Sequence, residues 1–265
     1  MTERANDGVG LVIVPTYNEV ENIERLVKEI LAQPVPLHVV VVDDNSPDGT
    51  GDVADDLAEE NDRVRVLHRP AKLGLGTAYR AGFDLALADD YKYALTMDAD
   101  FSHSPNYLPG LFALMQDYDV AIGSRYVKGG GSEGWALPRV LMSRGANAFA
   151  RGMLGLHTHD CTAGFRCYKT EVLKAIELDT IFSSGYSFLV EMVTRCERRG
   201  FAIGELPIIF RDRRSGRSKI SRIEILKSAY TIFRLKFPRL PWERWLNVYQ
   251  KHKRPQTSSD GGPRA

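Results

Sequence analysis

Residues 95–105 read LTMDADFSHSP and place two carboxylates, Asp98 and Asp100, directly after an apolar run. The run, 93–97, predicts a buried strand of a parallel sheet. α/β folds bind their ligands where such strands end. Two carboxylates at that place favour a divalent cation bridging to a diphosphate, because Mg²⁺ prefers one or two carboxylates together with phosphate oxygens. Acids at a helix N-terminus, favoured by the helix dipole, are the alternative interpretation of these residues alone.

Apolar runs of strand length recur on both sides of this stretch, with helical spacing between them. They lie at 10–14, 39–42, 64–67 and 119–123. This alternation predicts an α/β fold with a mainly parallel, doubly wound sheet. After Ser124 the alternation ends: a glycine-rich stretch at 125–131 predicts a flexible loop, and the patterns that follow predict helices over 138–154 and 187–199 and a strand over 201–210.

The composition is that of a soluble chain with a large core. The chain has 265 residues, 43% hydrophobic and 26% charged, which fits one large domain with an appendage. Its cysteines, Cys161, Cys167 and Cys196, are odd in number and form no zinc pattern, which favours a reducing, cytoplasmic compartment. The N-terminus has no apolar run and no stretch reaches 18 apolar residues, so we expect neither a signal peptide nor a transmembrane helix.

The net charge of +1 hides a strong asymmetry along the chain. Residues from Arg211 onward carry 15 Lys and Arg against 4 Asp and Glu, whereas the residues before it carry 20 against 30. A basic end indicates an anionic partner: a nucleic acid, a membrane surface or a phosphorylated substrate. The basic segment contains no recognised nucleic-acid motif, and the acids at the sheet edge would repel a polyanion, so we expect no nucleic-acid partner.

The basic end divides into three parts by composition. Residues 211–219 predict a mobile basic loop, and residues 250–265 a disordered tail. Between them, residues 220–249 predict an amphipathic segment. Its apolar stripe consists of Ile223, Leu226, Tyr230, Phe233 and Phe237. The stripe either packs against the main domain, over residues 9–210, or lies in a membrane interface.

An ordered set of motifs resembles glycosyltransferase family 2, with its nucleotide-sugar-binding fold of the Rossmann-like GT-A type. The family pattern is carried by VPTYNE at 14–19, VDDNSPDGT at 42–50 and DAD at 98–100. The chain is most similar to the dolichyl- or polyprenyl-phosphate mannosyltransferase branch, through GSRY at 123–126, EGW at 133–135, SRG at 143–145, TAGFR at 162–166 and RRSGRSK at 213–219. The resemblance covers roughly residues 9–237.

The resemblance implies a role for each matching position. The residues expected to hold the nucleotide sugar are Pro15, Tyr17, Glu19, Asp43, Asp44, Asp98 and Arg213. Asp98 and Asp100 would bind Mg or Mn on the diphosphate, with Ser102 as a further ligand, directly or through water. Arg125, Arg139, Arg213 and Lys219 match positions that grip the phosphates of the donor or of the lipid acceptor. The expected catalytic residues are therefore Asp100, Arg125, Arg213 and Lys219.

The implied reaction is inverting, metal-dependent transfer of mannose from GDP-mannose to a polyprenyl monophosphate, giving a β-linked lipid phosphomannose and GDP. A UDP-glucose-dependent glucosyltransferase acting on the same lipid and a non-catalytic nucleotide-binding module are the alternatives. The implied partners are the donor, the lipid and a membrane surface, with a separate membrane anchor or a fused membrane domain as a further possibility. The expected location is the cytoplasmic face of a membrane, as a peripheral protein.

Acid–base chemistry supports a phosphate acceptor independently of the resemblance. An alcohol acceptor must lose a proton during attack and therefore needs a general base. A phosphate monoester has a second pKa of about 6 and is already an anionic nucleophile near neutral pH. Such an acceptor needs cations rather than a base, and the chain after Gly123 is rich in Arg and Lys. Asp160 and Glu191 are the candidate bases there, with structural hydrogen bonding as their other use.

Overall fold

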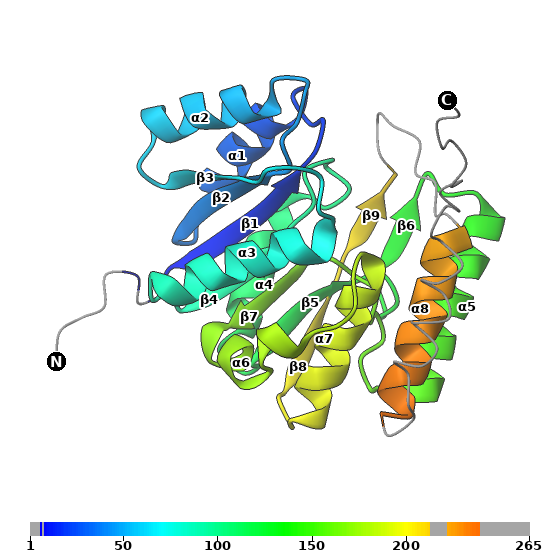
Figure 1. The fold of residues 1–265 in the computed structure, drawn as a ribbon. Helices are drawn as coiled ribbons and strands as arrows, with labels where there is room; N and C mark the ends of the chain where they lie inside the picture. The colour runs from blue at the N-terminus through cyan, green and yellow to red at the C-terminus, as the bar shows by residue number, and fades with distance from the viewer. Residues whose placement is uncertain (1–5, 7, 213–221, 239–265) are drawn as a thin grey trace, which may run out of the picture.

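A twisted central sheet organises the molecule (Figure 1). The computed structural model describes residue 6, residues 8–212 and residues 222–238. In this part of the chain the main sheet has seven strands in the order β3-β2-β1-β4-β7-β5-β8. Their bounds are β1 Gly10–Thr16, β2 Leu37–Asp43, β3 Val64–His68, β4 Tyr93–Thr96, β5 Val120–Ser124, β7 Arg166–Lys169 and β8 Ile203–Pro207. Only β7 runs antiparallel to its neighbours, so the expected α/β fold with a mainly parallel sheet is confirmed.

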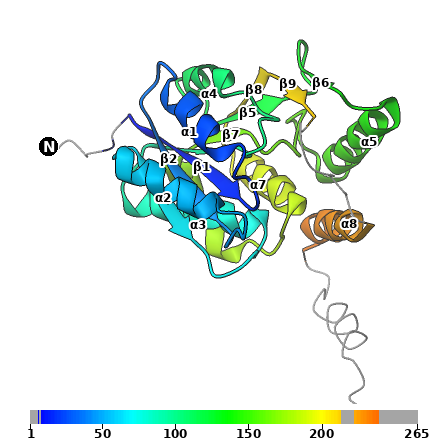
Figure 2. The same ribbon diagram turned by 90° about the horizontal axis from the view of Figure 1, so that it is seen from above.

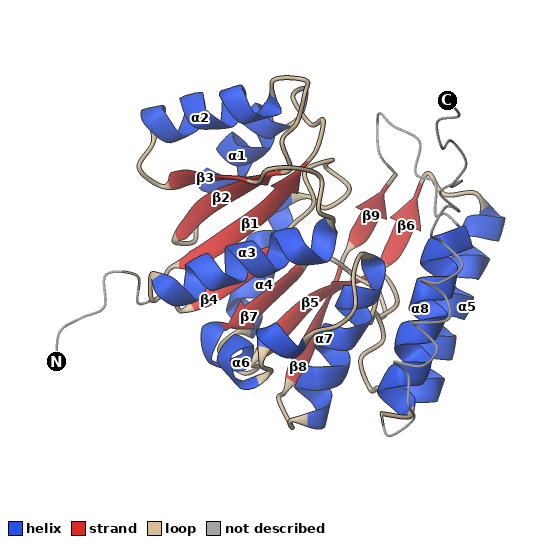
Figure 3. Cartoon of the chain, in the orientation of Figure 1, coloured by secondary structure: helices blue, strands red, loops and turns tan. Residues whose placement is uncertain are grey.

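Helices cover both faces of this sheet (Figures 2 and 3). They are α1 Ile23–Leu31, α2 Thr50–Glu60, α3 Leu75–Ala88, α4 Leu108–Leu114, α5 Leu137–Leu154, α6 Thr170–Ala175, α7 Tyr186–Arg198 and α8 Arg222–Lys236. One hydrophobic core joins α1, α2 and α4 to Val12 and Val14 of β1. The other joins α3, α6 and α7 to Leu11 and Ile13 of the same strand. Alternate residues of β1 thus face opposite cores, which explains its unbroken apolar sequence.

Two elements depart from the sequence prediction. The strand predicted over 201–210 is wrong as a single strand, because β8 joins the main sheet while β9 Ile209–Arg211 pairs with β6 Gly131–Glu133 in a separate two-stranded sheet. β7, which is only four residues long, was not predicted at all. The stretch predicted as a flexible loop forms turns and leads into β6. A Cβ at Gly130 would lie 2.5 Å from the Ser124 carbonyl oxygen, so that turn requires glycine.

The described part of the basic end extends the fold with one helix. Arg211 lies in β9, so the predicted loop 211–219 is wrong at its first residue, and 213–219 lie outside the described residues. α8 lies beside α5 in both views (Figures 1 and 2), with the rings of Phe149 and Phe233 6.5 Å apart. Residues 239–249 and the predicted tail 250–265 also lie outside the described residues. Among the helices described, none is long and apolar enough to cross a membrane.

α8 leaves part of the predicted apolar stripe exposed. Over residues 227–236, where its side chains are described, the buried ones are Thr231, Ile232 and Leu235. Phe233 and Phe237, which belong to the predicted stripe, are 39% and 45% exposed. Phe233 therefore contacts Phe149 of α5 and is also partly open to solvent, as is Phe237.

Candidate active site

The predicted site residues gather at one edge of the sheet. β1, β2, β4 and β5 run in the same direction, so the residues after their carboxyl ends meet there. Asp43 ends β2, Asp98 and Asp100 follow β4, and Arg125 follows β5. The edge is formed by loops, which is where α/β folds present their functional side chains.

Asp43 folds the loop after β2. It is 2% exposed and accepts hydrogen bonds from the Thr16 hydroxyl at 2.9 Å, the Ser46 amide at 2.9 Å and the Ser46 hydroxyl at 2.5 Å. Asp44 is also buried and forms an ion pair with Arg69, whose guanidinium additionally donates to Thr77 at 2.8 Å. Both acids therefore border the site with their carboxylates engaged by the protein.

Half-buried residues at the end of β1 and just after it lie on the same side of the site. Pro15, Tyr17 and Glu19 are all partly exposed. Glu19 accepts a hydrogen bond from the Asn22 side chain at 2.8 Å. The Lys72 ammonium lies 3.8 Å from the centre of the Tyr17 ring, a cation–π contact that the sequence interpretation missed.

The positions of Arg69 and Lys72 after a predicted strand could have identified them from the sequence. Both follow the third strand, and the carboxyl end of that strand opens at the same edge as those of β1 and β2. Basic side chains that follow a parallel strand lie at the ligand-binding edge of the sheet, as acidic ones do. Arg69 neutralises Asp44, and Lys72 brings an additional positive charge beside Tyr17.

The two carboxylates after β4 are oriented by neutral donors. The Tyr79 hydroxyl donates to Asp98 Oδ1 at 2.8 Å, and the Ser102 amide donates to Asp100 Oδ1 at 3.0 Å. The side chain of Asp98 is 25% exposed, whereas Asp100 is 8% exposed. Between Asp100 and Ser102, Phe101 has a φ of 58°, a left-handed conformation that is uncommon for a bulky residue. The chain thus turns at Phe101, between Asp100 and the Ser102 amide that donates to it.

The residue after Ser102, His103, has a buried side chain. It is 3% exposed, and its ring lies 5.1 Å from that of Phe165 and 5.2 Å from that of Phe210. Burial lowers the pKa of His103 below its usual range, although the charges of Asp98 and Asp100 act in the opposite direction. His103 Nδ1 lies 3.9 Å from Asp98 Oδ2 and has no hydrogen-bond partner among the described residues.

The donor set after β4 fits Mg²⁺ or Mn²⁺. Carboxylate and hydroxyl oxygens are the hard ligands that Mg²⁺ prefers. The hydroxyl of Ser102 is buried and lacks a hydrogen-bond partner in the described part of the chain, as a group held for an ion or its bound water would. No cluster of three His, Cys, Asp or Glu that could hold an ion occurs among the described residues. An ion here would take the rest of its shell from water or from phosphate oxygens.

Arg125 forms a buried ion pair on the other side of the site. Its Nε and Nη2 donate to the two carboxylate oxygens of Asp160 at 2.7 and 2.8 Å, and Nη2 also donates to Thr162 at 2.8 Å. Burial by itself would raise the pKa of Asp160, but the hydrogen bonds and charge of Arg125 hold it below its usual range. Asp160 thus has a structural role here and is fixed as a carboxylate.

The loop that carries Asp160 is anchored by two buried residues. Arg166, which is 0% exposed, donates to the carbonyls of Cys161 at 3.0 Å and Ala163 at 2.7 Å. The side chain of Asn147, from α5, accepts from the Cys161 amide at 3.0 Å. These contacts fix the chain on both sides of the ion pair.

Arg139 occupies a more exposed position. Its Nη1 donates to both oxygens of Asp212 at 2.9 and 3.0 Å, and its guanidinium carbon lies 4.2 Å from the centre of the Trp135 ring. The structure thus gives Arg125 and Arg139 each a carboxylate partner and brings Asp98 and Asp100 together on one loop. Arg213 and Lys219 lie outside the described residues.

Glu191, the other candidate base, is also engaged. It is 0% exposed and accepts from Arg195 Nε at 2.9 Å, Arg195 Nη2 at 2.6 Å and the Ser183 amide at 3.0 Å. Its position in α7, paired within its own helix, indicates a structural role.

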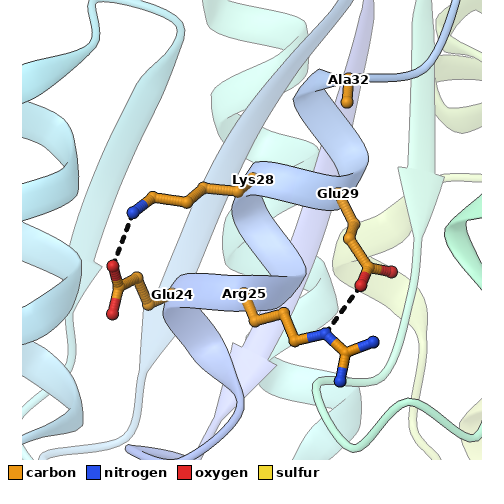
Figure 4. Close-up of a pocket in the computed structure, with 5 residues that line it drawn as sticks. All are labelled: Glu24, Arg25, Lys28, Glu29 and Ala32. Carbon is orange, nitrogen blue, oxygen red and sulfur yellow. Dashed lines mark hydrogen bonds and ion pairs between the residues drawn. The ribbon is translucent and has the colours of Figure 1, made fainter.

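A surface depression lies beside α1, where the guanidinium carbon of Arg25 is 4.9 Å from the centre of the Phe101 ring. Figure 4 shows its charged side chains paired along the helix, Lys28 with Glu24 at 2.6 Å and Arg25 with Glu29 at 2.8 Å. These exposed pairs join residues four positions apart, a spacing that stabilises a helix.

Comparison with known proteins places these features in a family. Glycosyl transferase family 2 matches residues 11–177. The chain is 45% identical over 224 residues to the polyprenol monophosphomannose synthase of Mycolicibacterium smegmatis, covering 84% of each chain. It is 46% identical over 211 residues to the undecaprenyl-phosphate mannosyltransferase of Micrococcus luteus, covering 80% of this chain and 87% of the relative.

Solved structures share the fold at lower sequence identity. Glucosyl-3-phosphoglycerate synthase from Mycobacterium tuberculosis with Mn²⁺, UDP and glucosyl-3-phosphoglycerate has a TM-score of 0.61 at 19% identity, over 86% of this chain and 79% of that one. The same enzyme with Mg²⁺ and UDP has a TM-score of 0.59 at 20% identity, over 87% and 78%. This likeness concerns the fold alone. The family match and the two relatives show that the chain is a glycosyltransferase that belongs to glycosyl transferase family 2.

Proposed function

We propose that this enzyme transfers mannose from GDP-mannose to a polyprenyl monophosphate in a single displacement. An acceptor phosphate oxygen forms a bond to the anomeric carbon while the bond from that carbon to the diphosphate breaks, and GDP leaves. One displacement inverts the configuration, so α-linked GDP-mannose gives a β-linked product. The substrate class is supported by the names of two relatives at 45% and 46% identity.

The observation that carries the proposal is that both candidate bases are held by arginines. Asp160 is bound by Arg125 and Glu191 by Arg195, each through two nitrogen atoms. Neither is available to take a proton from an alcohol. A phosphate monoester with a second pKa of about 6 needs no base near neutral pH, so it suits this site as acceptor.

The residues after β1, β2 and β4 would bind the donor. Pro15, Tyr17 and Glu19 would contact the nucleoside. Hydrogen bonds from the Thr16 hydroxyl to Asp43 and from the Glu19 amide to Thr50 tie their segment to the loop after β2. Lys72, above Tyr17, would add a positive charge for the diphosphate.

Asp98 and Asp100 would hold Mg²⁺ or Mn²⁺ on the diphosphate, with Ser102 beside them. When bound, the ion would neutralise the charge that develops on the departing GDP. Tyr79 and the Ser102 amide fix the two carboxylates before substrate arrives, and such preorganised groups need no rearrangement during the reaction.

The residues after β5 would position the acceptor phosphate. Arg125 bonds to Asp160 and Thr162 through Nε and Nη2, so its Nη1 would contact a phosphate oxygen. Arg139 would add a second contact when it leaves Asp212. Arg213 and Lys219 would complete the binding of the phosphates.

The exposed apolar side chains of α5 and α8 would contact the membrane that holds the lipid. We call them the apolar surface: Leu137, Leu141, Met142, Phe149, Phe233 and Phe237, all at least 39% exposed. Exposed Arg144, Lys227 and Lys236 lie on the same two helices. Large apolar groups with basic neighbours are typical of helices that lie in a membrane interface. We propose on this basis that the protein lies peripherally on a cytoplasmic membrane face, with or without a separate membrane anchor.

Labelled-sugar transfer to a short-chain polyprenyl phosphate tests the proposal. GDP-mannose and UDP-glucose run in parallel with Mg²⁺, with Mn²⁺ and with chelator, and the anomeric configuration of the product is read by nuclear magnetic resonance. Metal-dependent formation of the β-mannosyl product is expected. Transfer from UDP-glucose alone would overturn the donor assignment, and an α-linked product would overturn the single displacement.

A further inference from the structure

A second basic cluster lies away from the candidate active site, where the carboxyl ends of α7 and α8 meet. It lines a depression of about 350 Å³, within the size range of small-ligand sites. Four arginines surround it, together with three apolar residues. The lining residues are Phe182, Arg195, Arg198, Arg199, Arg234, Leu235 and Pro238.

The topology separates this arginine pocket from the active site. α7 leads directly into β8, which runs parallel to β5. The carboxyl end of α7 therefore lies at the amino-terminal edge of the sheet, opposite the edge that carries Asp98 and Arg125. Figure 1 shows the ends of both helices at the bottom of the molecule, away from the loops after β1 and β2.

The four arginines differ in whether a carboxylate pairs with them. Arg195 is paired with Glu191, and Arg199 lies 3.5 Å from Glu177. Arg198 and Arg234 have no carboxylate within ion-pair distance among the described residues: Arg198 donates to the Leu235 carbonyl at 2.9 Å, and Arg234 donates to the Tyr230 hydroxyl at 3.1 Å. The pocket therefore has an excess of two positive charges. The partial negative charge of two helix ends balances only part of it.

The geometry of Arg234 favours an anion with an apolar neighbour. Its guanidinium carbon lies 3.9 Å from the centre of the Phe182 ring, which holds the planar group in place from one side. Guanidinium groups match phosphate oxygens through paired hydrogen bonds. Leu235 and Pro238 form an apolar wall, and the exposed Phe237 adjoins Pro238.

We propose that Arg198 and Arg234 form a binding site for a phosphate group, separate from the site of glycosyl transfer. The phosphate group belongs either to an anionic lipid headgroup or to a soluble phosphate compound. A headgroup would hold this end of α8 against the membrane, and a soluble phosphate would occupy the same arginines in solution.

The test compares the full chain with Arg198→Gln, Arg234→Gln and the double variant. A matched control, Lys28→Gln with Arg63→Gln, removes the same charge from exposed positions at the other end of the sheet. Sedimentation with vesicles of phosphatidylglycerol and phosphatidylcholine measures headgroup binding, and calorimetric titration with inorganic phosphate measures the soluble source. Circular dichroism checks that each variant is folded, and Arg234→Gln alone removes no partner of a buried carboxylate.

Loss of two basic residues that contact an anionic surface is expected to weaken vesicle binding by about thirtyfold in the double variant. The control is expected to lose less than about threefold, because its charges lie beyond the screening distance from the pocket. Phosphate titration that is abolished in the double variant would support the soluble source instead. Equal losses in the double variant and the control, with no phosphate binding, would overturn the proposal. Mannosyl transfer to a detergent-dispersed acceptor should be the same in the native chain and in all variants. Absence of transfer in the native chain would count against the proposed function and not against the arginine pocket.

Discussion

Two halves of the active-site edge hold their carboxylates in different ways. After β2 and β4, Asp43 and Asp98 accept hydrogen bonds from hydroxyl groups that bring no charge, whereas Asp44 is paired with Arg69. After β5, Asp160 is bound by Arg125, and Asp212, next to β9, is bound by Arg139. The first half thus keeps negative charge that suits a cation. The second half holds arginines whose positions are fixed by acids, which suits the orientation of a phosphate without an excess of positive charge.

The largest effect is expected from the carboxylates of the first half. Asp100→Asn keeps the size of the side chain and removes its charge, so transfer should fall by roughly 10³-fold, by analogy with the loss of a group that stabilises developing charge. Metal titration of the remaining activity should require a higher metal concentration. The matched control is Asp56→Asn on the exposed surface of α2, which should keep full activity. Equal activity of Asp100→Asn and the control would break the distinction between the two halves.

A large effect on stability is expected in the second half. Asp160→Asn leaves the buried guanidinium of Arg125 without its counter-charge, which should lower the free energy of unfolding by about 3–5 kcal/mol in urea denaturation. Asp212→Asn is the matched comparison, because it breaks a partly exposed pair with Arg139 and should cost less than about 1 kcal/mol. A similar loss in both variants would show that burial does not separate the two pairs.

The contribution of Asp160 to the unfolding free energy should also depend on pH. The pKa of Asp160 is lower in the folded protein than in the unfolded chain, so its contribution is fully present above the unfolded pKa of about 3.9. The contribution is lost as the pH falls through the folded pKa. The difference in unfolding free energy between the native chain and Asp160→Asn should therefore be constant from pH 7 to about 5 and shrink below about pH 4. A difference that grows on acidification would contradict the assignment.

A smaller effect is expected for the apolar surface. Phe233→Ser with Phe237→Ser should weaken partition onto lipid vesicles by about tenfold or more, because two aromatic side chains no longer leave water on binding. Transfer to a detergent-dispersed short-chain acceptor should stay unchanged. Reduced transfer to that acceptor would instead place α8 in the reaction itself.

The smallest effect is expected at the exposed face of α1. Glu29→Gln breaks the exposed pair with Arg25 shown in Figure 4 and should change the unfolding free energy by no more than about 0.5 kcal/mol. Transfer should be unchanged. A loss of activity would make the depression beside α1 part of the site.

The parallel part of the fold could be predicted because each strand is an unbroken apolar run that ends in polar loop residues. β7 was missed because four residues that contain the buried Arg166 do not give an apolar pattern. Asp98 and Asp100 could be found because they lie two residues apart in one loop. The Arg125–Asp160 pair joins residues 35 positions apart, so no local pattern reveals it. The exposure of Phe233 and Phe237 depends on which side α8 turns to α5 and α7, and helical spacing alone does not give that side.

The central claim is that the acceptor arrives as an anion and that the enzyme supplies no general base. Its most direct test is to offer GDP-mannose, with Mg²⁺ or Mn²⁺, a polyprenyl monophosphate and the corresponding polyprenol at equal concentration, and to measure both rates between pH 6 and 8. Transfer to the phosphate alone is expected, at a rate that changes little above the phosphate pKa of about 6. Transfer to the alcohol at a comparable rate would contradict it, because such a reaction requires a base at this site.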